Sequence, residues 1–116
     1  MTHTLAELED TNTRIRILND TFRKTGEGGE TYLTRGIAEL EAPMRATVLD
    51  VVRTFDDWSD DNDPWQQHDC AMFEVDSMRI MFKIDYYDLD KEWGSADPAD
   101  SAVTTRVLTV MLADEY

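Results

Sequence analysis

Apolar residues recur at helical spacing over residues 5–24, and this pattern predicts an amphipathic helix. The residues of its apolar stripe are Leu8, Ile15, Leu18 and Phe22, with Leu5 and Ile17 beside them. Gly26 is expected to end the helix, because glycine adopts the left-handed conformation of a C-terminal cap without strain. The Gly-rich stretch 26–30 carries two glutamates and lacks the Lys-Ser/Thr of a phosphate-binding loop, so we interpret it as a connection.

A short strand and a second helix are predicted next. Residues 31–34 have the composition of a strand, and Arg35-Gly36 is expected to turn or bulge the chain before Ile37 continues that strand. Pro43 suits the first turn of a helix, because its missing N–H has no intrahelical partner at that position. The apolar stripe of this helix is formed by Met44, Val48, Val51 or Val52, and Phe55.

Residues 71–87 contain two runs with apolar residues at alternate positions, which predicts a β-hairpin with its turn at Asp76-Ser77. Ile80, Phe82 and Ile84 are expected on the core-facing side of the second strand. A last helix is expected to begin at Asp97-Pro98, with the aspartate as N-cap. Its apolar stripe would consist of Val103, Val107, Val110 and Met111.

This order of elements predicts an α+β fold, with about three helices packed on a small antiparallel sheet of about three strands. The 116 residues fit one domain spanning 1–116, and 41% hydrophobic residues supply a small core. Cys70 is the only cysteine, so no internal disulfide forms. The chain has neither a signal-peptide pattern nor a long apolar run, so we expect a cytoplasmic protein without membrane contact.

The charge of the chain is strongly negative and unevenly distributed. There are 25 acidic and 11 basic residues, for a net charge of −14. Residues 1–54 carry nine acids and seven bases, whereas residues 55–116 carry sixteen acids and four bases. Such a surface repels nucleic acid and anionic membranes and attracts basic partners. General solubility, a genome rich in Asp and Arg, or a halophilic origin would give a similar excess of acids.

Two acidic segments account for most of this charge, and we expect their carboxylates to contact a partner. The first segment, 55–69, contributes Asp56, Asp57, Asp60, Asp61, Asp63 and Asp69 and contains no Lys or Arg. The second contributes Asp85, Asp88, Asp90, Glu92, Asp97 and Asp100. Both segments flank the predicted hairpin, so they are candidates for neighbours in space. Clustered like charges cost the folded state free energy, which makes a functional reason for them attractive.

The spacing of these acids does not match an EF-hand. Counted from Asp57, the sixth loop position is Asn62 instead of glycine and the twelfth is His68 instead of glutamate. An irregular Ca²⁺ or Mg²⁺ site formed by Asp60, Asp61, Asp63 and Asp69 remains an alternative. A structural zinc site is disfavoured because it usually draws on four Cys or His ligands.

Enzyme signatures are weak. His68 and Cys70 are close in sequence, but nothing supplies an orienting group or oxyanion donors for a cysteine nucleophile. A nuclease motif needs an acid two residues before a lysine, and Met81 and Leu89 occupy those positions. Glycosidase-like carboxylate pairs stay open but unspecific, because many acid pairs are available. Trp58 and Trp65 are suited to stacking on sugars or bases, but we favour a role in holding the loop to the body.

Several short motifs resemble a bacterial family of small acidic proteins, catalogued only as a domain of unknown function (the 3768 series). They are LTRG at 33–36, DNDP at 61–64, HD at 68–69, FKIDYYDLD at 82–90, DPAD at 97–100 and VLTVMLADEY at 107–116. The resemblance extends over roughly residues 14–116. It implies a bacterial origin, often on plasmids and other mobile elements, and it transfers no activity and no catalytic residue.

These observations favour a binding protein that is not an enzyme and needs no cofactor or metal. We expect an acidic module that imitates the charge of DNA and binds a basic nucleic-acid-binding protein, such as an anti-restriction or anti-CRISPR inhibitor. Residues 55–116 contain thirteen Asp and three Glu, and the shorter side chain fixes its charge with less entropy loss. The alternatives are a divalent-metal-dependent enzyme or Ca²⁺-stabilised module using residues 56–69, and a regulatory interaction protein without DNA mimicry.

Overall fold

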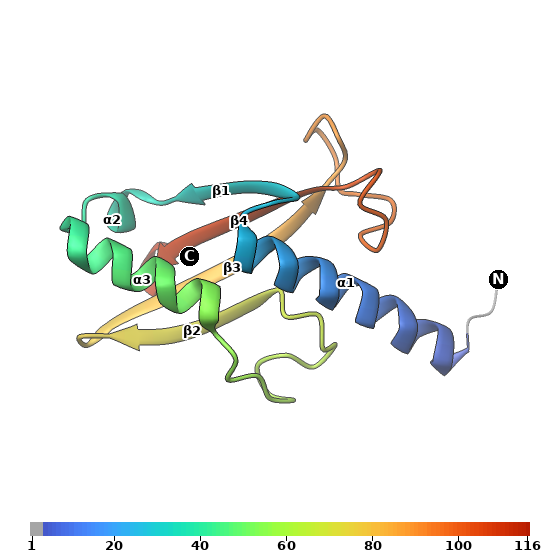
Figure 1. Ribbon diagram of the computed structural model, residues 1–116, viewed down its shortest axis with the longest axis horizontal. Helices are drawn as coiled ribbons and strands as arrows, with labels where there is room; N and C mark the ends of the chain where they lie inside the picture. Colours follow the sequence, from blue (N-terminus) through green and yellow to red (C-terminus); the bar gives the residue numbers. More distant parts are fainter. Residues whose placement is uncertain (1–3) are drawn as a thin grey trace.

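The computed structural model describes residues 4–116, except for the side chain of Leu8. Over this range a four-stranded sheet has the order β1-β4-β3-β2 (Figure 1). The strands are β1 (Gly29–Leu33), β2 (Cys70–Val75), β3 (Met78–Tyr87) and β4 (Thr105–Leu112). The helices are α1 (Leu5–Thr25), α2 (Arg35–Ala38) and α3 (Ala42–Thr54), with a final 3₁₀ turn, η1 (Ala113–Glu115). The α+β class is confirmed.

The sheet differs from the prediction in two ways. It has four strands where about three were expected, and it is mixed, because β1 pairs with β4 in parallel while the other pairs are antiparallel. The parallel pair depends on Gly29, which lies opposite Arg106 at the start of β1. A Cβ atom at Gly29 would overlap the backbone carbonyl of Arg106, so only glycine permits this approach.

The first predicted helix is confirmed as α1, and its predicted end at Gly26 is confirmed as well. Gly26 has φ 78° and donates its backbone N–H to the Phe22 carbonyl at 2.7 Å. Ile15 and Phe22 of the predicted stripe are buried, whereas Leu5 and Ile17 are exposed. The second predicted helix is also confirmed as α3, with Pro43 in its first turn and with Val48 and Val52 buried.

The predicted continuation of β1 through Ile37 is wrong. The chain leaves the sheet after Thr34, whose backbone N–H still bonds to the Val110 carbonyl, and forms the short helix α2. Ile37 is fully buried there. A helix of four residues is too short for an apolar period to reveal, and its single apolar residue fits a strand equally well.

The predicted last helix is also wrong. Asp97 and Pro98 lie in a turn, and Val103 is exposed in the loop that follows. The other residues of the predicted stripe, Val107, Val110 and Met111, belong to the interior strand β4. Leu108 and Val110 are buried on the side that faces the helices, and Val107 and Met111 are buried on the other side. A strand that is buried on both faces does not alternate, so its apolar residues also fitted a helical period.

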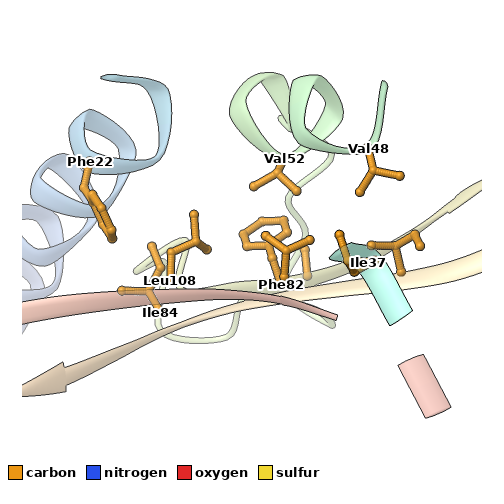
Figure 2. Packing of buried hydrophobic residues seen from close by; sticks show 10 residues of the cluster. Phe22, Ile37, Val48, Val52, Phe82, Ile84 and Leu108 are labelled. Atoms are coloured by element: carbon orange, nitrogen blue, oxygen red, sulfur yellow. The ribbon is translucent and has the colours of Figure 1, made fainter. Parts of the chain in front are cut away.

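The core lies between the helices and one face of the sheet. Figure 2 shows Phe22 of α1 and the α3 residues Val48 and Val52 directed toward Phe82 and Leu108 on the strands. The predicted hairpin is confirmed, with Ile80, Phe82 and Ile84 buried on the core side. Its turn residues, Asp76 and Ser77, have φ values of 48° and 70°, as tight hairpin turns require.

Candidate functional site

Both acidic segments lie at the same end of the sheet, where β2 begins, β3 ends and β4 begins. The first acidic loop (residues 55–69) connects α3 to β2, and the second acidic loop (residues 88–104) connects β3 to β4. In Figure 1 α1 runs between the two loops, with the second loop above it and the first below it. The loops therefore share one end of the molecule but lie on opposite flanks of α1.

The first acidic loop is fastened by a stack of two aromatic rings. The rings of Trp58 and His68 are nearly parallel, at 6°, with centroids 4.2 Å apart. His68 Nδ1 lies 2.9 Å from a carboxylate oxygen of Asp20 on α1, and Nε2 lies 3.4 Å from Asp63 Oδ2. Both ring nitrogens thus face carboxylates, which leaves neither available as a base for a substrate.

The side chain of Asp63 is buried inside the first acidic loop. It is only 5% exposed, and Oδ1 accepts the backbone N–H groups of Gln67 at 3.0 Å and His68 at 3.1 Å. Gln66 and His68 both have φ 56°, a left-handed conformation that costs non-glycine residues free energy. The Asp63 carboxylate holds this strained turn in place.

Arg23 of α1 ties the start of the loop to the end of α3. It is 3% exposed, and its Nη1 donates to the Val52 carbonyl at 2.9 Å and to the Phe55 carbonyl at 3.1 Å. Carbonyl groups at a helix end lack intrahelical partners and attract a cation. Arg23 Nη2 also bonds Asp20 at 2.8 Å, and the guanidinium lies 5.5 Å from the ring centroid of Trp58.

Asn19 connects α1 to three further parts of the molecule. Its Nδ2 donates to the Gln67 carbonyl at 3.0 Å and to the Tyr86 hydroxyl at 2.8 Å, and its Oδ1 accepts from Arg106 Nε at 2.8 Å. Burial raises the pKa of Tyr86 to about 12, although the hydrogen bond from Asn19 opposes this rise. Burial also lowers the pKa of Arg106.

Four predicted contact residues remain exposed on this fixed loop. Asp56, Asp57, Asp60 and Asp61 are exposed, and their carboxylates form no ion pair or hydrogen bond with the rest of residues 4–116. They are held in place through the backbone, since Asn62 donates to the Asp57 carbonyl at 2.9 Å and accepts the Ser59 N–H at 2.8 Å. The loop therefore presents four free negative charges from a fixed backbone.

Asp69 and Asp85 lie where the loops meet the sheet. Asp69 is half-buried, and burial raises the pKa of its carboxyl, with repulsion from Asp63 and Asp85 adding to the rise. Asp85 pairs with Lys83 at 2.7 Å, and this hydrogen bond raises the pKa of Lys83. The charge of Asp85 is therefore compensated.

The second acidic loop uses most of its carboxylates to form turns. Asp88 accepts the Glu92 N–H at 3.0 Å, Asp97 the Ala99 N–H at 3.1 Å and Asp100 the Ala102 N–H at 2.9 Å. Asp90 and Glu92 are exposed and have no side-chain partner among the described residues. Lys91 lies between them and pairs with Glu30 of β1 at 2.7 Å.

The described residues offer little support for a metal site, a reactive cysteine or a membrane-spanning helix. Among residues 4–116, no group of three or more His, Cys, Asp or Glu side chains is arranged to hold a metal ion. Burial raises the pKa of the Cys70 thiol, with repulsion from Asp69 and Asp63 adding to the rise, and a raised pKa disfavours the nucleophilic thiolate. Within the same range, no helix combines the length and hydrophobicity needed to cross a membrane.

The α1 residues that hold the first acidic loop were not predicted from the sequence. Asn19, Asp20 and Arg23 lie among the apolar residues of the α1 stripe, and Asn19 and Arg23 follow Ile15 at intervals of four. Polar residues at core-facing positions of a helix need internal partners, and this is the signal that could have identified them.

Comparisons with known proteins place the chain in a family. A search of curated proteins and a search of solved structures found no significant match. A family model described as "Protein of unknown function (DUF3768)" matches residues 33–115, a range that includes both acidic loops and the strands β2, β3 and β4. The chain therefore belongs to the DUF3768 family of proteins of unknown function.

Proposed function

We propose that this protein is an acidic binding module that presents DNA-like charge to a basic, nucleic-acid-binding protein. One observation supports the proposal above all: Asp56, Asp57, Asp60 and Asp61 are exposed and unpaired on a loop whose backbone is held by internal contacts. A structural role would not require these four charges, because the contacts that fix the loop come from Trp58, Asn62, Asp63 and His68.

The rigidity of the loop favours binding. Binding costs less conformational entropy when the charged groups of the loop are already held in place. Carboxylates and phosphates both accept two parallel hydrogen bonds from an arginine, so a surface built to bind phosphates accepts a carboxylate cluster as well. A net charge of −14 also accelerates the approach of a basic partner and repels nucleic acid itself.

The biological setting rests on the resemblance of the sequence motifs to a bacterial family that often lies on plasmids and other mobile elements, and the inhibitory role is an analogy. We place the protein in the bacterial cytoplasm, encoded on a mobile element, where it inhibits a nucleic-acid-binding defence protein of the anti-restriction or anti-CRISPR type. The exposed carboxylates would occupy the surface that the defence protein uses for the DNA backbone. Inhibition by this route needs no catalytic residue and no cofactor.

The proposal is tested by capture with DNA competition. The tagged protein is incubated with a lysate of its source cells at about 150 mM salt, where nonspecific attraction between surface charges is largely screened. The captured protein should bind duplex DNA on its own, and added duplex DNA should release it from the tagged chain. Capture of a protein that duplex DNA does not release, or no capture at all, would contradict DNA mimicry.

A further inference from the structure

An open groove lies between the N-terminal half of α1 and residues 64–66 of the first acidic loop. It has a volume of about 410 Å³. Trp65 forms part of one wall and is 70% exposed, and Leu5 on the helix is 72% exposed. The groove thus brings an exposed tryptophan and an exposed leucine together, and exposed aromatic residues are common at binding sites.

Glu9 supplies the groove with an uncompensated negative charge. It lines the groove, and its carboxylate has no ion pair or hydrogen bond within the part of the chain that the structure describes. Its neighbour Asp10 differs, because it pairs with Arg14 at 3.2 Å. The groove thus combines an open indole, an aliphatic side chain and a free carboxylate.

Arg16 fixes the geometry of the groove and defines its polarity. Its Nη1 donates to the Gln66 carbonyl at 3.1 Å, which joins the helix to the loop wall. Glu9 and Arg16 are seven residues apart, or about 10 Å along a helix. A cation is therefore repelled at the Arg16 end and attracted at the Glu9 end.

We propose that this groove binds the guanidinium group of an arginine on the basic partner. The planar cation would stack on the Trp65 indole and pair with the Glu9 carboxylate, while its aliphatic stem contacts Leu5. Arginine fits better than lysine, because a guanidinium both stacks on an aromatic ring and forms two parallel hydrogen bonds with a carboxylate. The identity of the partner rests on the proposed function, but the chemistry of the groove does not.

The test uses two capped tripeptides, Gly-Arg-Gly and Gly-Lys-Gly, titrated into the ¹⁵N-labelled protein and followed by NMR. The arginine peptide should produce saturable shifts at the Trp65 indole N–H and the Gln66 amide, with a dissociation constant about three-fold or more below that of the lysine peptide. Trp65→Ala and Glu9→Gln should each weaken binding of the arginine peptide by about two- to five-fold. Trp65→Phe should retain most of the binding.

Trp93→Ala is the matched control, because Trp93 is a 74% exposed tryptophan on the second acidic loop. It should leave the binding of the arginine peptide unchanged. Absence of saturable shifts at Trp65, equal affinity for both peptides, or an equal loss in Trp93→Ala would overturn the proposal. Thermal melts of all variants show whether a loss of binding comes from the groove itself or from unfolding of the protein. Failure of the proposed function would appear separately, as a captured partner that duplex DNA does not release.

Discussion

The indole of Trp58 stacks on the imidazole of His68, with ring planes 6° apart, and this contact closes the first acidic loop onto α1. Trp58 also contacts Phe55 and Phe82 edge-on, at centroid distances of 4.8 and 6.1 Å. A loop with six aspartates is thereby attached to the hydrophobic core. The favourable burial of these rings opposes the mutual repulsion of the carboxylates.

Removal of this stack should loosen the loop. Trp58→Ala is expected to lower the free energy of unfolding by about 2–3 kcal/mol, less than a fully buried tryptophan because Trp58 is half-buried. Denaturant unfolding measures the loss, and hydrogen exchange should report faster exchange of the loop amides. Trp65→Ala should change stability by less than about 0.5 kcal/mol, because Trp65 is 70% exposed. Equal effects of the two substitutions would show that Trp58 does not fasten the loop.

Substitution of Asn19 should lower the free energy of unfolding more than substitution of most other polar residues. Asn19→Ala removes three hydrogen bonds and leaves Arg106 Nε buried without its acceptor. We expect a loss of about 3 kcal/mol in the free energy of unfolding. Asn12→Ala is the control, since Asn12 makes one side-chain bond to the loop, with Gln67, and should cost about 1 kcal/mol. Denaturant melts of both variants decide the point.

Asp63 and Asp61 should behave differently although both belong to the same acidic run. Asp63→Ala removes the acceptor of two backbone N–H groups and should cost about 1–3 kcal/mol. Asp61→Ala removes an exposed, unpaired charge and should be neutral or slightly stabilising, because repulsion within the loop falls. If the two variants unfold at the same denaturant concentration, the inward role assigned to Asp63 is wrong.

Asp69 makes stability depend on pH. Its pKa is raised in the folded protein, so protonation favours folding, and that contribution is lost as pH rises through the folded-state pKa. Asp69→Asn should therefore stabilise the protein at neutral pH, and the difference from the unsubstituted protein should shrink as pH falls toward the ordinary aspartate pKa of about 3.9. Thermal melts between pH 3 and pH 7 measure this, with Asp90→Asn as the exposed control. A stabilisation that grows as pH falls would contradict the assigned direction.

Helices and strands whose apolar residues recur at a regular spacing could be predicted from the sequence. Ile15 and Phe22 in α1, Val48 and Val52 in α3, and Phe82 and Ile84 in β3 each lie on one buried face, so their spacing identified the element. The strand β4 has no such spacing, because it is interior and buried on both sides. The parallel pairing of β1 with β4 depends on contacts between residues more than 70 positions apart, which local patterns do not contain.

The candidate site was predictable by location but not by the role of each residue. Composition alone identified residues 55–69 as a concentration of charge. It could not separate Asp63, which accepts two internal N–H groups, from Asp61, which is free, because that difference arises from the fold of the turn at 63–68. The contacts from Asn19 and Arg23 come from residues more than 25 positions away from the groups they bind.

The central claim is that the location of the exposed carboxylates, and not the total charge, determines partner binding. Two variants with the same net charge separate these possibilities. The loop variant carries Asp56→Asn, Asp57→Asn, Asp60→Asn and Asp61→Asn. The control variant carries Glu27→Gln, Glu41→Gln, Asp76→Asn and Asp114→Asn, which replace exposed acids without ion pairs elsewhere in the described chain.

The decisive measurement is the association rate and affinity of both variants for the captured DNA-binding partner, at about 150 mM salt with duplex DNA as competitor. The loop variant should lose about ten-fold or more in affinity, mainly through slower association because electrostatic steering is lost. The control variant should stay within about two-fold of the unsubstituted protein, because its charges lie away from the loop. An equal loss in both variants would contradict the claim and leave the first acidic loop as solvated surface.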